Sequence, residues 1–194
     1  MASADFPKLF GVVVNLREPS INDAEDIVCL MSYNVSKYLY EVPNPYTIED
    51  AINFIKSAHS DFNSLTALHF AIEYRDKSEP ANNLVLVGAI SLKNIDLVNK
   101  KADLGYWIGE QYWGRGIATE CIRLVIHYAL SELELEEVSA YVFPENKASI
   151  RVLEKNGMKK KGQVNEYHKI SGRYRISLIY VIGESDDERI SQSL

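Results

Sequence analysis

The sequence has 194 residues, which is enough to bury one substantial core and short for two domains. Hydrophobic residues make up 46% and charged residues 25% of the chain, an ordinary globular composition that argues against disorder and against a fibrous class. Lys and Arg total 21 against 27 Asp and Glu, and with a net charge of −6 we expect no nucleic-acid partner. We predict one domain over residues 1–183 and an acidic, solvated tail over residues 184–194.

Neither a membrane segment nor a secretory signal is predicted. The longest apolar run, residues 84–90, has seven residues counting one glycine, whereas a helix needs about 20 to cross a bilayer. The N-terminus lacks the basic and apolar regions of a signal peptide, so we expect a cytoplasmic protein without a membrane partner. Cys29 and Cys121 lie within apolar helical patterns, and we interpret both as core residues.

The first half of the chain predicts strands and two capped helices. Residues 9–16 are rich in β-branched side chains and predict a strand. Ser20 and Thr47 are each followed three residues later by Asp, a capping pattern that predicts helices running to about residues 31 and 58. Residues 68–74 and 84–92 predict an antiparallel hairpin joined by a polar turn.

The second half continues the alternation of strands and helices. Gly157 suits the left-handed position that ends a helix, and Met158 beyond it can fold back on Leu153. The segment from there to the last strand is interpreted as a loop that begins with a solvated run of three lysines, residues 159–161. We predict strands over residues 103–108, 138–143 and 173–182, and helices over residues 117–130 and 146–156.

The most informative segment is the loop between the strand that ends at residue 108 and the following helix. Gly114 and Gly116 let the backbone turn tightly and approach a ligand without a Cβ in the way. The first N–H groups of the helix have no intrahelical partners and lie at its positive end, so they can bind a phosphate or pyrophosphate. A plain glycine turn remains an alternative for this motif alone. Thr119 stands where a dinucleotide fingerprint has its third glycine, and no nucleoside-triphosphate loop is present.

Two segments carry a resemblance to a known family. Residues 103–120, DLGYWIGEQYWGRGIATE, resemble the acetyl-CoA-binding strand, loop and helix of the GCN5-related N-acetyltransferases (GNAT), in the branch of the ribosomal-protein acetyltransferases RimJ and RimL. Residues 144–158, PENKASIRVLEKNGM, resemble the same branch, and weaker similarity extends over residues 9–182. The resemblance implies the GNAT α/β fold: a single mixed, largely antiparallel sheet, helices on both faces, and a splayed central cleft.

The resemblance implies acetyl-CoA as co-substrate and no metal. Backbone amides of the glycine loop would hold the pyrophosphate, Arg115 would add a charge-assisted contact, and the pantetheine arm would lie along the strand before the loop. The positions that match the cofactor site are Tyr106, Trp107, Ile108, Gln111, Gly114, Arg115, Gly116, Ile117, Ala118 and Asn146.

The resemblance further implies direct acetyl transfer, with a backbone N–H near Trp107 or Ile108 serving the carbonyl oxygen. Ser149 matches the residue that protonates the leaving thiolate, and Asn146 matches one that contacts the cofactor arm. Asn146 can equally be a helix N-cap that accepts the Ser149 N–H, and one residue can do both.

The base that accepts the amine proton has three candidates. His168 falls near an acidic position of the resembling branch, Asp103 begins a strand and can act through water, and Glu73 lies on an earlier strand. The other histidines have structural interpretations: His127 is solvated, His59 ends a helix, and His69 opens a strand without an identified partner. Tyrosines 33, 38 and 40 either shape the acceptor pocket or pack as aromatic residues.

We therefore predict an acetyl-CoA-dependent N-acetyltransferase that acts on a primary amine, preferably a protein or peptide N-terminus. Two alternatives stay open: a small amine such as a polyamine, amino acid or aminoglycoside as acceptor, or a CoA-binding regulatory module without turnover. A negative acceptor cleft would favour a cationic amine, and an open groove would favour a peptide. The sequence predicts neither the oligomeric state nor the pathway.

Overall fold

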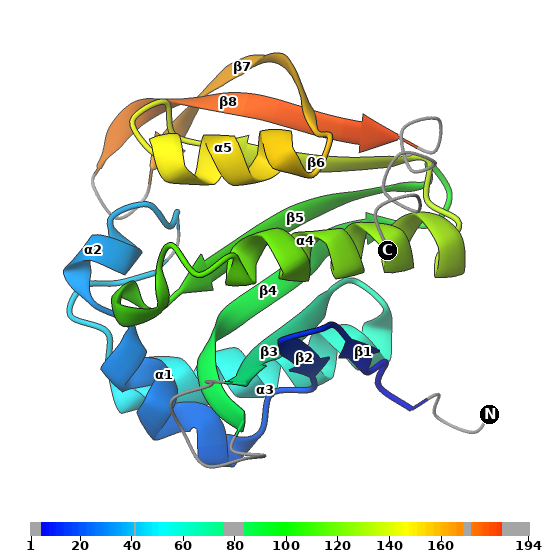
Figure 1. Cartoon of the computed structure of the whole chain (residues 1–194). Helices are drawn as coiled ribbons and strands as arrows, with labels where there is room; N and C mark the ends of the chain where they lie inside the picture. Colours follow the sequence, from blue (N-terminus) through cyan, green and yellow to red (C-terminus); the bar gives the residue numbers. More distant parts are fainter. Residues whose placement is uncertain (1–4, 41, 76–83, 169–171, 184–194) are drawn as a thin grey trace.

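The structure is a computed structural model that describes residues 5–40, 42–75, 84–168 and 172–183. One mixed sheet of eight strands, in the order β1-β2-β3-β4-β5-β6-β8-β7, forms the centre of the molecule (Figure 1). All neighbouring strands are antiparallel except β5 and β6, which run parallel. The strands are β1 (Leu9–Phe10), β2 (Val14–Arg17), β3 (Leu68–Arg75), β4 (Leu84–Asp96), β5 (Lys101–Ile108), β6 (Glu137–Val142), β7 (Lys159–His168) and β8 (Arg173–Gly183).

Helices cover both faces of this sheet, so the predicted GNAT-type architecture is confirmed (Figure 1). Buried side chains of α4 pack with those of β2 to β6 in the larger core. A smaller core joins α1 and α3 on the opposite face, where Trp107 of β5 packs against it. The helices are α1 (Ala24–Leu30), α2 (Tyr33–Ser36), α3 (Ile48–Ser64), α4 (Ile117–His127) and α5 (Lys147–Lys155).

Both predicted capping patterns are present. Ser20 and Thr47 form capping boxes with the Asp three residues later, and Asp50 N–H donates to the Thr47 hydroxyl over 3.2 Å. The first box opens a 3-10 turn that continues into α1. The second opens α3, which runs six residues beyond the predicted end and stops where Leu65 adopts a left-handed φ of 54°.

The prediction of one strand over residues 9–16 was wrong, because the chain reverses there. β1 and β2 form a tight hairpin in which Gly11 N–H donates to the Val14 carbonyl over 2.8 Å. The carboxylate of Glu120, on α4, accepts the backbone N–H groups of Val12 and Val13. A side chain 107 residues away thus satisfies the turn's donors, a contact that no local pattern shows.

The C-terminal half differs from the prediction in one strand. β7 occupies the segment interpreted as a loop, and it forms the outer edge of the sheet against β8. Lys161 of β7 donates to a Glu137 carboxylate oxygen over 2.6 Å, so part of the lysine run is paired. The helix end at Gly157 is as predicted, with φ of 79° and a bond from Met158 N–H to the Leu153 carbonyl of 3.2 Å.

The two cysteines differ in exposure, which corrects the interpretation of both as core residues. Cys121 is buried in the larger core, whereas Cys29 lies on the exposed side of α1. Within the described ranges, no helix has the length and apolar character needed to span a membrane. The acidic tail predicted over residues 184–194 lies outside the described residues.

Candidate active site

The central feature of the site is a separation of the two parallel strands. β5 pairs with β6 only over four residues, from Lys101 opposite Glu137 to Leu104 opposite Ala140. Beyond Leu104, β5 stays paired with β4 as far as Ile108, opposite Gly88. The edge of β5 that would face β6 is therefore open from residue 105 onward, and a cleft of about 1370 Å³ occupies the gap.

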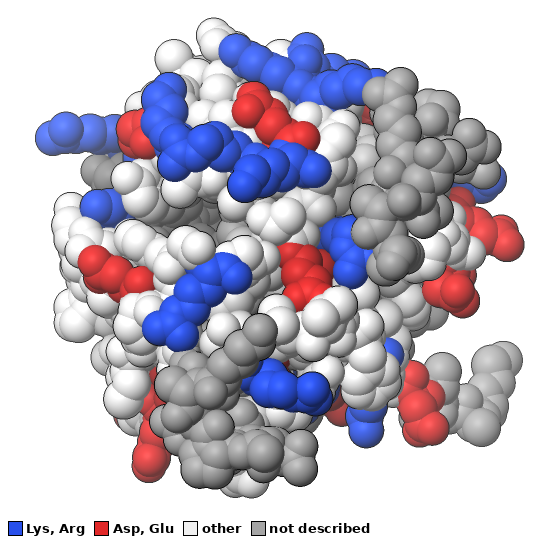
Figure 2. All heavy atoms as spheres, viewed as in Figure 1, with Lys and Arg blue, Asp and Glu red and all other residues white. Residues whose placement is uncertain are grey.

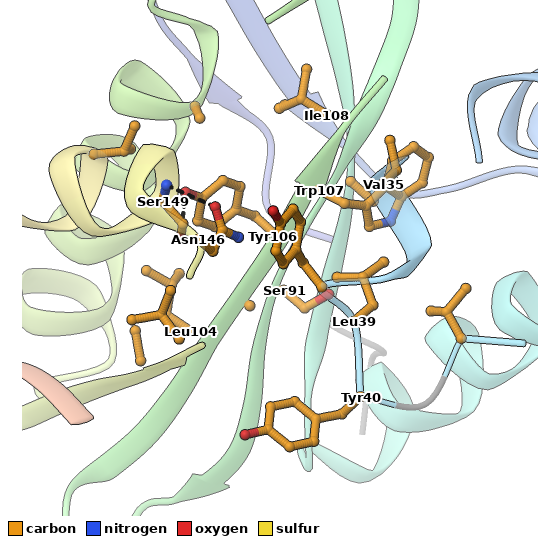
Figure 3. A pocket seen from close by; sticks show the side chains of 18 of the residues that line it. Val35, Leu39, Tyr40, Ser91, Leu104, Tyr106, Trp107, Ile108, Asn146 and Ser149 are labelled. Atoms are coloured by element: carbon orange, nitrogen blue, oxygen red, sulfur yellow. Dashed lines mark hydrogen bonds between the residues drawn. The ribbon is translucent and has the colours of Figure 1, made fainter. Parts of the chain in front are cut away.

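Alternation along β5 sends successive side chains into the two halves of the cleft. Tyr106 points toward α5, while Trp107 points toward α2 and Val35 (Figure 3). We call the side with Tyr106 and α5 the cofactor half. The side with Trp107, α2 and α3 is called the acceptor half.

The glycine loop has the backbone geometry that its sequence predicts. Gly114 and Gly116 have φ of 77° and 81°, and Gly116 is the N-cap residue just before α4. Trp113 donates its indole N–H to the Ile108 carbonyl over 2.7 Å and so ties the loop to the end of β5. Residues 112–119 line the cleft, whereas Gln111 does not. Its carbonyl instead accepts an Arg115 guanidinium N–H over 3.2 Å.

Ser149 and Asn146 lie where α5 begins, facing β5. The Asn146 side chain accepts the Ser149 N–H over 3.2 Å, so the predicted N-cap is present. The Tyr106 hydroxyl donates to Ser149 Oγ over 2.9 Å across the cleft (Figure 3). Burial raises the pKa of Tyr106 to about 12, with the Ser149 contact acting in the opposite direction, so this tyrosine stays protonated near neutral pH. Ser149 Oγ thus accepts the Tyr106 hydroxyl, and the Ser149 hydroxyl hydrogen can be donated to another acceptor.

A row of cations on α5, which the sequence reasoning missed, lines the cofactor half. Lys147, Arg151 and Lys155 are exposed, line the cleft and are spaced four residues apart, which places them on one helix face. Figure 2 shows Lys and Arg side chains gathered along the rim of the hollow beside α5. Such a row suits the phosphates of an anionic cofactor. The four-residue spacing in KASIRVLEK was the signal that could have found it.

The candidate bases lie in different places. Asp103 lines the acceptor half and accepts an amide N–H of Asn94 over 2.8 Å. Glu73 is engaged by the Arg17 guanidinium at 2.7 Å and is not part of the cleft lining. The backbone of His168 pairs with Arg173 in the β7–β8 hairpin, and its side chain lies outside the described part of the structure.

His69 has partners that the sequence did not reveal. It is 7% exposed, its Nδ1 lies 2.8 Å from Ser91 Oγ, and its Nε2 lies 3.1 Å from Asp61 Oδ2. His59 contacts the Pro19 carbonyl over 2.9 Å and is not at a helix end, since α3 continues to Ser64. His127 is exposed beside Ser131, in line with its interpretation as a solvated residue.

Tyr38 and Tyr40 line the acceptor half, whereas Tyr33 is 64% exposed and does not. The Tyr40 ring packs against Phe143 with centroids 4.8 Å apart. Burial, followed by the nearby Glu166 carboxylate, raises the pKa of Tyr40. Both roles expected for these tyrosines, pocket shaping and aromatic packing, are therefore combined in Tyr40.

Comparison with known proteins decides the family. The family model described as "Acetyltransferase (GNAT) domain" matches residues 14–159, about three quarters of the chain. The chain belongs to the GNAT acetyltransferases. It is an acyltransferase that uses acetyl-CoA, and the resemblance stated from the sequence is confirmed.

Relatives from Bacillus subtilis align over most of the chain. "Uncharacterized N-acetyltransferase YoaA" is 33% identical over 84% of this chain and 88% of that protein. "Putative ribosomal N-acetyltransferase YdaF" is 32% identical over 87% of this chain and 88% of that protein. Among solved structures, Mycobacterium smegmatis RimJ in complex with CoA-disulfide has a TM-score of 0.82 at 20% identity, covering 99% of this chain and 95% of that chain. The relative YdaF supports the branch of the ribosomal-protein acetyltransferases, and the likeness to RimJ shows a shared fold.

Proposed function

We propose that this GNAT enzyme acetylates the N-terminal amine of a protein or peptide. The observation that carries the proposal is the separation of β5 from β6 beyond Leu104, with the Tyr106–Ser149 hydrogen bond on one side and an open acceptor half on the other. One substrate can enter from each side and meet at the exposed edge of β5.

The described residues fit acetyl-CoA in the cofactor half. Gly114 and Gly116, both at positive φ, let the loop amides and the first turn of α4 face a pyrophosphate. The cations on α5 would hold a further phosphate, and the open edge of β5 at residues 106–108 can pair with the amides of a pantetheine arm.

In the proposed reaction, the amine nitrogen attacks the thioester carbonyl, the C–S bond breaks, and the thiolate takes a proton from Ser149. Tyr106 donates to the Ser149 oxygen over 2.9 Å and so stabilises it as the proton leaves. The proton that the attacking nitrogen loses on becoming an amide restores the Ser149 hydroxyl. A backbone N–H near Trp107 or Ile108 would stabilise the oxyanion. The amine must arrive without its proton. Of the three bases that the sequence proposes, Asp103 and His168 are kept, because Glu73 does not line the cleft.

The choice of acceptor rests on size and on a relative. The cleft of about 1370 Å³ spans both halves, so it can hold the end of a chain beside the cofactor. The B. subtilis relative YdaF has a name that points to ribosomal acceptors. We place the enzyme in the cytoplasm, in keeping with its two free thiols.

A small cationic amine is the second candidate, and the charges of the cleft favour it. The carboxylates that line the acceptor half of the described structure are Asp50, Asp61, Asp103, Glu145 and Glu166, whereas Lys93 is the cation among them. Several of these acids already have partners, since Glu145 pairs with Arg175 and Asp50 caps α3. The several ammonium groups of a polyamine could pair with the remaining carboxylates. A peptide N-terminus brings a single ammonium group and needs only one such partner.

The test is a panel of amines with acetyl-CoA. Peptides with Ser, Ala and Met N-termini, spermidine, spermine, amino acids and an aminoglycoside are assayed for thiol release, and mass spectrometry locates the acetyl group. We expect the highest kcat/KM for a peptide N-terminus. A higher value for spermidine would transfer the proposal to the polyamine, and acetyl-CoA binding without release for any amine would support a regulatory module.

A further inference from the structure

Ser91, on the floor of the acceptor half, lies where an acceptor amine has room. It lies directly opposite Gly105 across the β4–β5 ladder, so the two residues face the same side of the sheet. A Cβ built at Gly105 would meet no atom within 4 Å, which means that the space above this glycine is open. Trp107 lies two residues along the same face, so the open space adjoins the strand edge proposed for the thioester (Figure 3).

His69 connects Ser91 to Asp61, which comes from α3. An ionised carboxylate only accepts hydrogen bonds, so the 3.1 Å contact with Asp61 requires that His69 Nε2 carries the ring hydrogen. Nδ1 then has a lone pair, and it accepts the Ser91 hydroxyl over 2.8 Å. Because Ser91 donates to His69 and His69 donates to Asp61, the Ser91 oxygen can accept a hydrogen bond from a group in the cleft.

The surroundings of His69 keep its imidazole neutral. Burial lowers its pKa most, Asp61 opposes this, and the Lys93 ammonium, on the neighbouring strand, lowers it further. Phe54 of α3 packs edge-to-face on the ring with centroids 5.5 Å apart. The other carboxylates that line this half of the cleft are Asp50, Asp103, Glu145 and Glu166. A neutral imidazole at working pH can take up a proton.

We propose that Ser91, His69 and Asp61 form a relay that removes the proton from the acceptor amine. The proposal rests on the proposed acetyltransferase function and names its base. Ser91 is the catalytic residue, because it touches the amine, and His69 and Asp61 act through it. The ammonium proton passes to Ser91 Oγ as the Ser91 hydroxyl proton passes to His69 Nδ1. Asp61, whose side chain is 36% exposed, stabilises the imidazolium and leads the proton to solvent.

The relay leaves Ser91 chemically unchanged. The amine nitrogen, now with a lone pair, forms the bond to the acetyl carbon as the C–S bond breaks, and the proton on His69 returns to solvent. A serine paired with histidine and aspartate is also the arrangement of acyl-enzyme catalysts, so an acetylated Ser91 is the competing chemistry. Intact-mass analysis after mixing the protein with acetyl-CoA alone should show no added acetyl group, and an acetyl group on Ser91 would overturn the relay.

A first experiment tests the relay without an acceptor. In 15N-histidine NMR spectra of the full chain with bound CoA, His69 should be in the Nε2–H form at pH 7 and titrate below the ordinary value near 6.5. Asp61→Asn should change its tautomer balance, whereas His59 serves as an internal reference because it contacts different partners. An Nδ1–H tautomer at His69, or an imidazolium at pH 7, would overturn the proposal.

A second experiment uses the best acceptor of the panel. His69→Asn keeps an acceptor for the Ser91 hydroxyl but cannot hold the proton, and His59→Asn is the matched control. We expect kcat/KM of His69→Asn to fall about 100-fold near pH 7 and to recover as pH approaches the pKa of the amine, while acetyl-CoA affinity and Tm stay near those of the wild type. Ser91→Ala should show the same pH dependence.

The outcomes separate the relay from the proposed function. A loss of kcat/KM in His69→Asn that stays constant from pH 6 to pH 9 would make His69 structural. An unchanged kcat/KM in His69→Asn, together with a large loss in Asp103→Asn, would assign the base to Asp103. If the wild type binds acetyl-CoA but acetylates no amine, the proposed function fails. The NMR experiment alone then decides whether the hydrogen-bond chain exists as described.

Discussion

The Tyr106 hydroxyl donates to Ser149 Oγ over 2.9 Å, which joins the open strand β5 to the first turn of α5. The contact brings together two residues 43 positions apart in the chain, both of which take part in the proposed reaction. The contact also sets the direction of hydrogen bonding: the Tyr106 hydroxyl donates to Ser149, so the Ser149 hydroxyl can donate to a thiolate.

Ser149→Ala should lower kcat about 100-fold with little change in acetyl-CoA affinity, because the lost contact forms mainly in the transition state. Tyr106→Phe should lower kcat less, since Ser149 keeps its proton. Tyr180→Phe is the matched control, as its hydroxyl bonds Glu154 and does not line the cleft. Pre-steady-state thiol release measures the chemical step, and an unchanged rate in Ser149→Ala would contradict the assignment.

Gly114→Val should weaken acetyl-CoA binding at least tenfold. A Cβ at this position meets no atom within 4 Å, but valine resists the φ of 77° that orients the loop amides. Gly162→Val, at a position with open space and no positive φ, is the control. Isothermal titration calorimetry on the folded variants gives the affinities. Equal values for Gly114→Val and the wild type would show that the loop does not hold the pyrophosphate.

Arg151→Gln combined with Lys155→Gln should weaken CoA binding about tenfold while leaving dephospho-CoA binding nearly unchanged, because two cations would no longer face a phosphate. Lys56→Gln combined with Lys160→Gln, two exposed positions outside the cleft lining, removes the same charge and is the control. Competition binding at two salt concentrations makes the comparison. An equal loss for both ligands would place the cations elsewhere than at the 3′-phosphate.

Gly105→Leu should raise the acceptor KM at least tenfold without weakening acetyl-CoA binding. A Cβ at this position meets no atom within 4 Å, so the new side chain would extend into the open space opposite Ser91. Steady-state kinetics with the acceptor varied and acetyl-CoA saturating tests this. A KM as in the wild type would mean that the amine enters elsewhere.

Asp23→Asn should lower the free energy of unfolding by about 1–2 kcal/mol at pH 7. Burial alone would raise the pKa of Asp23, but hydrogen bonds from Arg17 and Ser20 lower it overall. A lowered folded pKa adds stability above the unfolded value near 3.9, and this stability disappears as pH falls through the folded value. Urea unfolding at pH 7 and in acid should therefore show a difference that shrinks below pH 4. A difference independent of pH would contradict the ion-pair account.

Local patterns predicted the parts of the fold that short-range chemistry determines. Thr47 with Asp50, and Gly157 with Met158, place helix ends through contacts within a few residues. The glycine loop was predicted for the same reason, since its positive φ values are a property of the backbone itself.

Long-range contacts account for what the sequence did not reveal. The β1–β2 turn depends on Glu120, and β7 lacks an alternating apolar face because it is an edge strand rich in lysine. The partners of His69 come from α3 and β4, at separations of 8 and 22 residues. Only the folded chain brings such residues together.

Because one of the two thiols is exposed and the other is buried, a thiol reagent can label the native protein at a single site. Burial raises the pKa of Cys121 and removes it from reagents, while Cys29 is exposed on α1. A maleimide dye will therefore attach at one position without any substitution. That position is two residues from Met31, which lines the acceptor half, so the fluorescence of the dye can report when an acceptor occupies the cleft.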